Sequence, residues 1–210
     1  RAMVNVTLVS LLTLIISFFK ESIFAYCFGA SYITDAYVAA IQLPTVIFSL
    51  VSTAISNVVL PFYSKKYNKY GQAEAEEYAA NMITVVSIIS LTAILLLEFF
   101  ARPTIKLLYP GMTAQTLDLT IILFRVVLPT VVLTQIMNIN TAVMNVHKCF
   151  VLPTVLPAFL NGATIVFIAF LFKSLGIYSA VLGVLCGTLI EFVVSIVGRR
   201  RFVKYRIVFD

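Results

Sequence analysis

Charged side chains interrupt stretches of this sequence that are otherwise apolar. Lys20 and Glu21 lie next to each other inside the first such stretch, and Arg125 lies inside a later one. A charged side chain at the centre of a membrane helix costs about 2.5–3.5 kcal/mol on insertion scales, so each of these residues calls for a partner or a function. Lys20 precedes Gly29, where the first stretch ends, by nine residues, which is roughly 13 Å along a helix. We therefore expect its ammonium group inside the membrane.

Hydroxyl and amide side chains share helix faces with these charges, because residues spaced by three or four lie on the same side of a helix. In chain order, the three polar faces carry Ser10, Thr13, Ser17 and Lys20; then Asp35, Gln42, Ser49 and Ser52; then Arg125, Thr134 and Asn138. Three such faces predict a shared hydrated cavity. Two alternatives stay open. The uncharged groups can serve to pack helices together, and Lys20, Glu21 and Arg125 can form a purely structural network of ion pairs.

The stretches that carry these residues are predicted to be membrane helices. Apolar residues make up 61% of the 210 residues and charged residues 11%, whereas soluble domains contain about 45–50% and about 25%. About 20 helical residues cross a bilayer, and six stretches are long enough: 4–28, 33–62, 78–100, 119–143, 150–172 and 177–197. Residues 1–198 are therefore expected to form an all-α integral membrane lobe of six transmembrane helices. Leu-Pro-Thr-Val occurs three times, at 43–46, 128–131 and 152–155, and its proline permits a kink.

The distribution of lysine and arginine predicts the orientation of the chain. The net charge is +6, but the basic residues lie beside apolar stretches, which fits membrane anchoring better than nucleic-acid binding. Ten basic residues lie on one side of the predicted membrane helices. They are Arg1, Lys148, three lysines of a polar loop expected over residues 63–77, and five residues of a basic juxtamembrane segment, 199–210. Three lie on the other side: Arg102, Lys106 and Lys173. Both termini are therefore predicted to be cytoplasmic.

Several classes of site find no support in the sequence. There is no nucleotide-binding glycine loop, catalytic triad or pair of catalytic carboxylates, and the three cysteines lack metal-ligand spacing. We expect no enzymatic activity, no cofactor and no metal site. His147 is predicted to be solvated in a short loop, and Glu98 and Asp118 to be solvated near the outer helix ends. The residues alone indicate one lobe of a transporter with a polar, partly cationic interior.

The motifs near the start of the chain resemble those of a known family. Residues 20–31 (Lys-Glu-Ser-Ile-Phe-Ala-Tyr-Cys-Phe-Gly-Ala-Ser), followed by Asp35-Ala36-Tyr37, are similar to the opening of the MurJ (MviN) lipid II flippases, in the multidrug/oligosaccharidyl-lipid/polysaccharide exporter superfamily. Further similarities follow in the family's order: Leu43-Pro44, Tyr109-Pro110-Gly111-Met112, Met144-Asn145, Pro153, Pro157 and Asn161. The resemblance covers nearly the whole chain and rests on the shared order and spacing of these motifs.

The resemblance implies a fold, a substrate and a set of site residues. It implies the N-terminal lobe of a two-lobed transporter whose C-terminal lobe is missing here. Such a transporter moves an undecaprenyl-diphosphate-linked saccharide, a lipid II-like peptidoglycan precursor, from the inner to the outer leaflet of the bacterial cytoplasmic membrane by alternating access. The residues expected to line the cavity and bind the diphosphate are Lys20, Arg125, Ser17, Thr13, Gln42, Ser49 and Asn138, and those expected in structural ion pairs are Glu21 and Asp35.

The sequence also departs from the family's pattern. Thr13 and Leu14 stand where the family has a serine and an arginine, and Lys20 replaces a second arginine, keeping the charge but losing the bidentate fork. The charged residues that follow the second-helix proline in the family are absent. The alternative function is a drug or small-molecule cation antiporter of the same superfamily, with Glu21, Asp35 or Glu191 as the protonatable carboxylate. A membrane scaffold without transport would need no polar interior.

Overall fold

The computed structural model describes residues 2–200, with side chains from residue 4 onward. Arg1 and residues 201–210, which hold most of the predicted basic segment, lie outside the described part. Within it the chain contains helices and no β-strands, which confirms the expected all-α fold. The helices are α1 (Ala2–Phe28), α2 (Tyr32–Tyr70), α3 (Gln72–Phe99), α4 (Ala101–Leu108), α5 (Ala114–Val127), α6 (Thr130–Val146), α7 (Val151–Leu175) and α8 (Ile177–Arg200).

Five of these helices, α1, α2, α3, α7 and α8, are long and apolar enough to cross a membrane. The predicted stretch 119–143 is not one continuous helix, because α5 and α6 meet at a bend of 46°. Pro129 is the N-cap of α6, and a proline at this point has no N–H to continue the helix of α5. Counted as one broken span, α5 and α6 bring the total to the predicted six.

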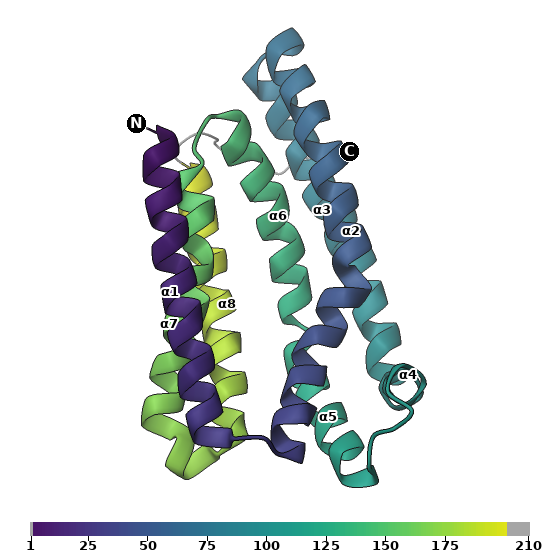
Figure 1. The fold of residues 1–210 in the computed structure, drawn as a ribbon. Coiled ribbons are helices and arrows are strands. Elements are labelled where there is room, and N and C mark those ends of the chain that lie inside the picture. Colours follow the sequence, from purple (N-terminus) through teal and green to yellow (C-terminus); the bar gives the residue numbers. More distant parts are fainter. Residues whose placement is uncertain (1, 201–210) are drawn as a thin grey trace.

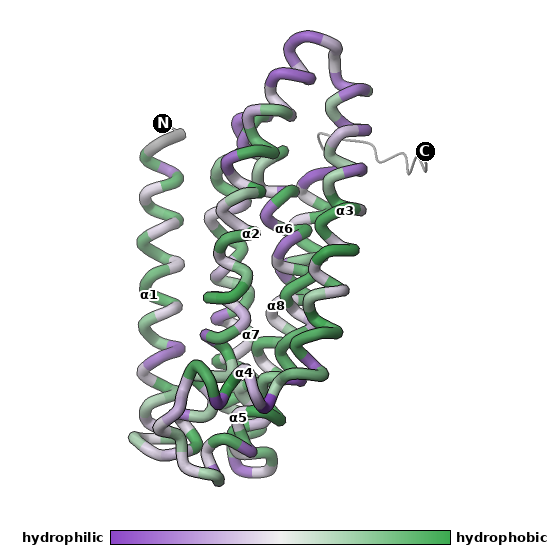
Figure 2. The backbone as a smooth tube through the Cα atoms, turned by 90° about the vertical axis from the view of Figure 1, so that its right-hand side faces the viewer, coloured by the Kyte–Doolittle hydropathy of each residue, from purple (hydrophilic) through white to green (hydrophobic). Residues whose placement is uncertain are grey.

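The polar loop expected over residues 63–77 is helical, so that prediction was wrong. Helix α2 continues to Tyr70, and Gly71 alone separates it from α3. Gly71 has φ +90°, which glycine adopts without steric cost and which lets the chain reverse at once. The 39 residues of α2 span about 58 Å, well beyond the ~30 Å hydrocarbon layer. The tip of the α2–α3 hairpin therefore projects past the apolar zone, and Figure 2 shows that this tip is hydrophilic.

The helices pack as two groups that meet at α6 (Figure 1). In one group, α7 packs against both α1 and α8. In the other, α2 packs against α3, α5 and α6. Helix α6 joins the groups by packing against α8 as well. Helices α1 and α2 consequently diverge from the short turn at residues 29–31 to opposite sides of the lobe, and near that turn Phe24 of α1 stacks on Tyr37 of α2 with ring centroids 4.6 Å apart.

Two glycines allow α7 and α8 to approach closely. A Cβ atom on Gly183 would lie 2.6 Å from Thr164 Cα, and one on Gly187 would lie 2.8 Å from Leu160 Cα. Real Cβ atoms do not come so near to backbone. Glycines spaced by four residues form the small-residue face that membrane helices use for tight packing. This contact fixes the α7–α8 pair, against which α1 is attached.

The basic side chains lie at the ends to which the sequence assigned them. The α2–α3 tip, the α6–α7 connection and the C-terminal end of α8 share one end of the lobe, and they carry Lys65, Lys66, Lys69, Lys148 and Arg200. The α4 region and the α7–α8 turn share the other end, with Arg102, Lys106 and Lys173. Which of these ends faces the cytoplasm stays a prediction.

Candidate functional site

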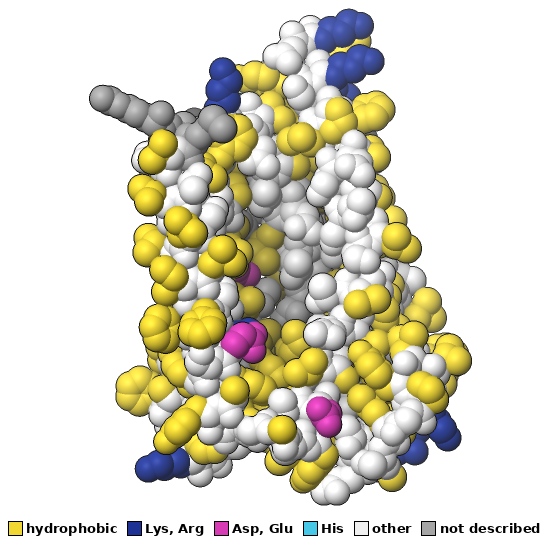
Figure 3. All heavy atoms as spheres, in the orientation of Figure 1, with side chains coloured by type: hydrophobic (Ala, Val, Ile, Leu, Met, Phe, Trp, Pro, Cys, Tyr) yellow, Lys and Arg dark blue, Asp and Glu magenta, His cyan; other side chains and the backbone are white. Residues whose placement is uncertain are grey.

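The face of the lobe between α1 and α2 is hollowed along its length, as Figure 3 shows. Acidic side chains gather on the lower half of this face, and one lies deep in the hollow. Helix α1 forms one wall and α2 the other, while α6 lies behind them. Most side chains of α1 that do not touch α7 are exposed. A ligand that lies between the walls would therefore meet both polar and apolar side chains.

The polar face of α1 bonds mainly to α7. The Thr13 hydroxyl donates to the carbonyl oxygen of Thr154 (3.2 Å). The Asn161 amide donates to the Ser17 hydroxyl (2.7 Å), which in turn donates to the carbonyl oxygen of Thr13 (2.9 Å). Asn161 is buried and comes from the middle of α7. The structure thus places Thr13 and Ser17, two predicted cavity residues, in the α1–α7 contact, the packing role that the sequence left open.

Lys20 lies one turn beyond Ser17, where the α1 face reaches the lower half of the lobe. Its Nζ is 2.6 Å from Glu21 Oε1. The Lys20 side chain is 23% exposed and that of Glu21 is 67% exposed. The Lys20 side chain is therefore mostly enclosed while its carboxylate partner is accessible, so a competing anion can replace Glu21 without stranding a buried carboxylate.

Asp35 and Gln42 are exposed near the start of α2. They line a groove of about 590 Å³ between α2 and the α4–α5 region, which contributes Tyr109 of the connection and Thr116 of α5. The ion pair expected for Asp35 is not found among the described residues, and Lys20 pairs with Glu21 instead. Ser49, further along α2, is exposed, and its hydroxyl donates to the Val46 carbonyl of its own helix (2.7 Å).

A small polar cavity of about 180 Å³ lies between α2, α6, α7 and α8. Ser52 and Gln135 line it and bond each other, with Gln135 Nε2 3.1 Å from Ser52 Oγ. Asn138, a predicted site residue, donates to the same hydroxyl (3.2 Å). Four threonines also line it, Thr45, Thr130, Thr134 and Thr188. Gln135 is 2% exposed and was not among the predicted site residues, although it lies one turn from Asn138.

Arg125 is not brought together with Lys20. Its Nε is 3.4 Å from Glu98 Oε2, and its Nη2 donates to the Glu98 carbonyl oxygen. Helix α5 packs against α2, α4 and α8, whereas α1 packs against α7. Asp118 is likewise ion-paired, with Arg102 of α4. The carboxylates expected to be solvated near the outer ends, Glu98 and Asp118, thus have arginine partners.

Comparison with known proteins decides the family of a chain with this architecture. A family profile described as lipid II flippase MurJ matches residues 24–208, most of the chain. The chain belongs to the MurJ family. The resemblance seen in the motifs of residues 20–37 is confirmed.

Individual MurJ proteins match over a similar range. A lipid II flippase MurJ of Thermosipho africanus is 28% identical over 179 residues, which is 85% of this chain and 37% of that protein. A probable lipid II flippase MurJ of Borreliella burgdorferi is 29% identical over 184 residues, which is 86% of this chain and 35% of that protein. The chain thus spans little more than a third of the length of these relatives.

A solved structure confirms the fold of the lobe. The structure titled lipid II flippase MurJ, inward closed conformation, superimposes with a TM-score of 0.82 at 26% sequence identity. The match covers 97% of this chain and 44% of that one. The all-α lobe of a MurJ-type membrane transporter, expected from the sequence, is therefore the fold of residues 2–200.

A buried polar network between α6 and α8 was not predicted. Arg199 is fully buried and donates through Nη1 to Asn140 Oδ1 (2.7 Å). Asn140 Nδ2 donates to the Ser195 hydroxyl (3.1 Å). The sequence placed Arg199 in a basic juxtamembrane segment, and that assignment was wrong. The reason is that Ser195 and Arg199 are four residues apart, on the face of α8 that packs on α6.

His147 is not the solvated loop residue that the sequence predicted. Its Nε2 lies 3.2 Å from the hydroxyl oxygen of Tyr63, and its ring contacts the Tyr67 ring edge-to-face, with the centroids 5.0 Å apart. Burial lowers the pKa of His147, while the nearby Glu76 carboxylate acts to raise it. The histidine therefore joins the α6–α7 connection to the projecting part of α2.

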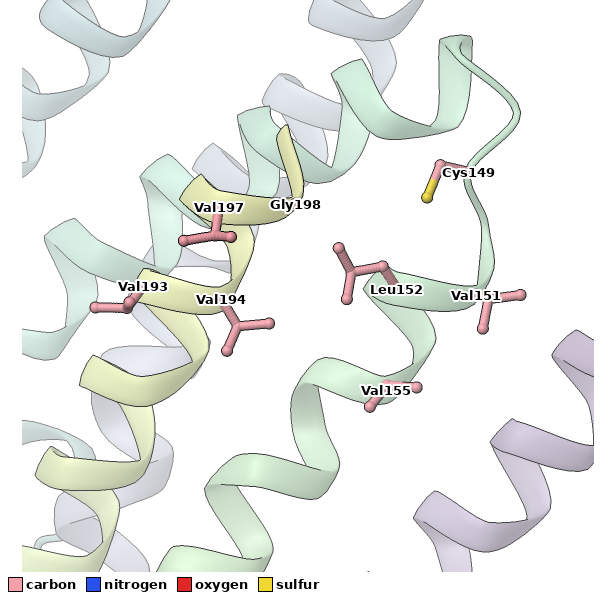
Figure 4. A pocket seen from close by; sticks show the side chains of 8 residues that line it. All are labelled: Cys149, Val151, Leu152, Val155, Val193, Val194, Val197 and Gly198. Atoms are coloured by element: carbon pink, nitrogen blue, oxygen red, sulfur yellow. The ribbon is translucent and has the colours of Figure 1, made fainter. Parts of the chain in front are cut away.

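An apolar groove of about 460 Å³ lies between the start of α7 and the end of α8. Figure 4 shows Leu152 and Val155 of α7 facing Val194 of α8, with Cys149 at the edge. All its lining residues are apolar, glycine or cysteine. None of the predicted site residues lines it.

Proposed function

We propose that this lobe is the N-terminal half of a flippase that carries an undecaprenyl-diphosphate-linked saccharide, a lipid II-like peptidoglycan precursor. The substrate passes from the inner to the outer leaflet of the bacterial cytoplasmic membrane by alternating access. Membership of the MurJ family supports this, as do the named functions of its matched relatives. The observation that carries the proposal is the hollow between α1 and α2, an open face with an enclosed cation on its wall. A second lobe, beyond this sequence, closes that hollow in the cycle.

Lys20 is the residue that engages the diphosphate. Its ammonium group is a point charge with three donors, which suits an anionic phosphate oxygen. Its present partner, Glu21, is mostly exposed, so exchanging that carboxylate for a phosphate leaves Glu21 hydrated in the hollow. Gln42 and Asp35 line the neighbouring groove between α2 and the α4–α5 region, where the amide can donate to or accept from saccharide hydroxyls and the carboxylate can accept from them.

The remaining predicted residues take supporting roles. Thr13 and Ser17 hold α1 to α7 and so set the position of Lys20. Asn138, through Ser52, ties α6 to the α2 wall. Arg125 stabilises the α3–α5 contact through Glu98. Diphosphate binding in this lobe thus rests on one lysine rather than on several arginines.

In the orientation that we propose, both termini and the α2–α3 tip lie in the cytoplasm. The support is that ten basic residues were assigned to that end and three to the other, in accord with the excess of Lys and Arg in cytoplasmic loops.

The test uses the complete protein in vesicles, with two substrates in parallel: a fluorescent undecaprenyl-diphosphate-linked saccharide and a cationic dye. We expect transport of the lipid-linked saccharide, a loss of at least about tenfold in Lys20→Ala, and retention of most activity in Lys20→Arg, since charge is kept and the guanidinium can bind phosphate. Lys173→Ala, an exposed lysine at the same end, is the matched control and should behave like the parent.

Two results would contradict the proposal. Transport of the dye without the saccharide would establish the cation antiporter instead. Normal saccharide transport by a stably folded Lys20→Ala protein would remove Lys20 from the binding site.

A further inference from the structure

Glu191 in α8 is the one carboxylate among the described residues that is more than nine-tenths buried; its residue is 8% exposed. Within residues 2–200 it forms no ion pair and no side-chain hydrogen bond. A buried carboxylate inside a membrane is costly as an anion, and no cation among the described residues pairs with Glu191. Neither packing nor the diphosphate site described above accounts for an acid at this position.

The register of the helices places Glu191 beside the small polar cavity. Thr188 and Val184, three and seven residues before it on the same face of α8, line that cavity. Helix α6 runs parallel to α8, and Asn140 bonds Ser195. Gln135 precedes Asn140 by five residues in α6, and Glu191 precedes Ser195 by four residues in α8. Gln135 and Glu191 therefore lie at about the same height along the two helices.

The helix segments around this position carry apolar and uncharged polar side chains. Helix α6 has no ionisable side chain between residues 130 and 146, and Lys173, at the far end, is the only one in α7. The close contact of Gly187 with Leu160 places Leu156 and Pro157 of antiparallel α7 near the height of Glu191. Helices α2 and α5 also pack against α8. Their charged residues lie towards the ends of the lobe or form ion pairs with α3 and α4: Asp35, Lys65, Lys66, Lys69, Asp118 and Arg125. On α8 itself, Arg199 is two turns away and bonds Asn140.

We propose that Glu191 is a proton-binding site of the transport cycle, loaded and unloaded through the polar cavity beside it. This rests on the proposed transport function. The step is simple: a proton from water adds to the carboxylate to give the neutral acid, and the reverse step returns it. The small volume of the cavity and the absence of three clustered acidic, histidine or cysteine side chains among the described residues favour a proton over a coordinated metal cation.

The physical link to transport is hydration. When the hollow is closed and dry, the neutral acid is the form that the surroundings of Glu191 tolerate. When α1 and α2 are open to water, the cavity between α2, α6, α7 and α8 hydrates and the proton can leave. A proton gradient then favours one direction of the cycle, because loading and release occur with the lobe open to opposite sides.

The experiment compares the complete protein with three variants in vesicles. Glu191→Gln is neutral and has the shape of the protonated acid, so it should fold; Glu191→Asp keeps a titratable group; Glu77→Gln removes an exposed carboxylate at the α2–α3 tip as control. Flipping of the lipid-linked saccharide is measured with and without an imposed pH gradient. We expect the gradient to change the rate several-fold in the parent, Glu191→Asp and Glu77→Gln, and to leave Glu191→Gln unchanged.

A second readout separates this inference from the proposed function. The melting temperature of the purified proteins is followed as pH rises from about 5 to 8. A buried site that holds a proton in the folded state loses stability as pH rises, so the parent should fall relative to Glu191→Gln, whatever it transports. Parallel melting curves, or an equal gradient response in Glu191→Gln, would overturn the inference. Absence of saccharide flipping in every variant would overturn the proposed function while leaving the melting comparison valid.

Discussion

The close approach of α7 and α8 predicts that one added methyl group will destabilise the lobe. In Gly187→Ala, the new Cβ would lie 2.8 Å from Leu160 Cα and 2.9 Å from the Leu160 carbonyl oxygen. Ordinary contact begins at 3.4 Å, so the helices must separate by at least about 0.6 Å. The atoms in the way are backbone, which cannot rotate aside as a side chain can.

Two effects set the size of the change. Overpacking of this kind costs about 1–3 kcal/mol. Replacing glycine by alanine inside a helix returns about 0.5–1 kcal/mol through backbone entropy. We therefore expect a net loss of up to about 2.5 kcal/mol, which corresponds to a fall in melting temperature of up to roughly 5–10 °C for a lobe of this size.

The chain offers its own reporter and its own control. The three free cysteines allow melting to be followed with a thiol-reactive dye in detergent, and Cys186, half-buried next to Gly187, reports on this contact. Gly162, in the middle of α7, has no atom within 4 Å of a built Cβ, so Gly162→Ala should melt at or above the parent temperature. If Gly187→Ala melts as high as Gly162→Ala, the α7–α8 packing described here is wrong.

Two other predictions concern the end of the lobe that carries the α2–α3 tip. Reporter fusions at Asn68 and at Lys173 should give cytoplasmic and external signals respectively, because the basic residues concentrate at the first of these ends; matching signals would contradict the orientation. Burial lowers the pKa of His147 below its usual value of about 6.5. The stability that the neutral ring contributes is therefore fully present above about pH 6.5, and it is lost as pH falls through the lowered pKa. Melting temperatures should therefore decline on acidification in the parent more than in His147→Gln, and equal declines would show that the Tyr63–His147 contact does not depend on the neutral ring.

Hydropathy was sufficient to locate the membrane helices but not their breaks. The same tetrapeptide, Leu-Pro-Thr-Val, has three different outcomes. Pro44 lies inside continuous α2, Pro129 separates α5 from α6, and Pro153 lies in the first turn of α7. A proline removes one backbone donor wherever it occurs, yet the surrounding packing decides whether the helix continues. That packing comes from residues distant in sequence, so the tetrapeptide alone could not predict the 46° bend.

The candidate site shows the same limit at the level of side chains. Spacing correctly placed Thr13, Ser17 and Lys20 on one face of α1. It could not tell whether that face meets a neighbour or the hollow, because the partner of Ser17 is Asn161, 144 residues away. Arg125 and Arg199 were misjudged for a related reason. Their partners, Glu98 and Asn140, belong to other helices. The spacing of residues within one helix cannot identify a partner on another helix.

The polar residues of this lobe fall into two groups, those whose hydrogen-bonding groups find partners on neighbouring helices and those whose charges do not. Hydroxyl and amide groups such as Ser17, Asn161 and Gln135 form hydrogen bonds between helices, which removes the cost of burying them and leaves nothing for a ligand to supply. Lys20 and Glu191 differ, because one has only an accessible carboxylate as its partner and the other has no side-chain partner among the described residues. Ionisable residues inside membrane helices commonly mark substrate or ion pathways. We propose that a diphosphate binds the lysine and a proton binds the glutamate, and that binding and release of both drive the transport cycle.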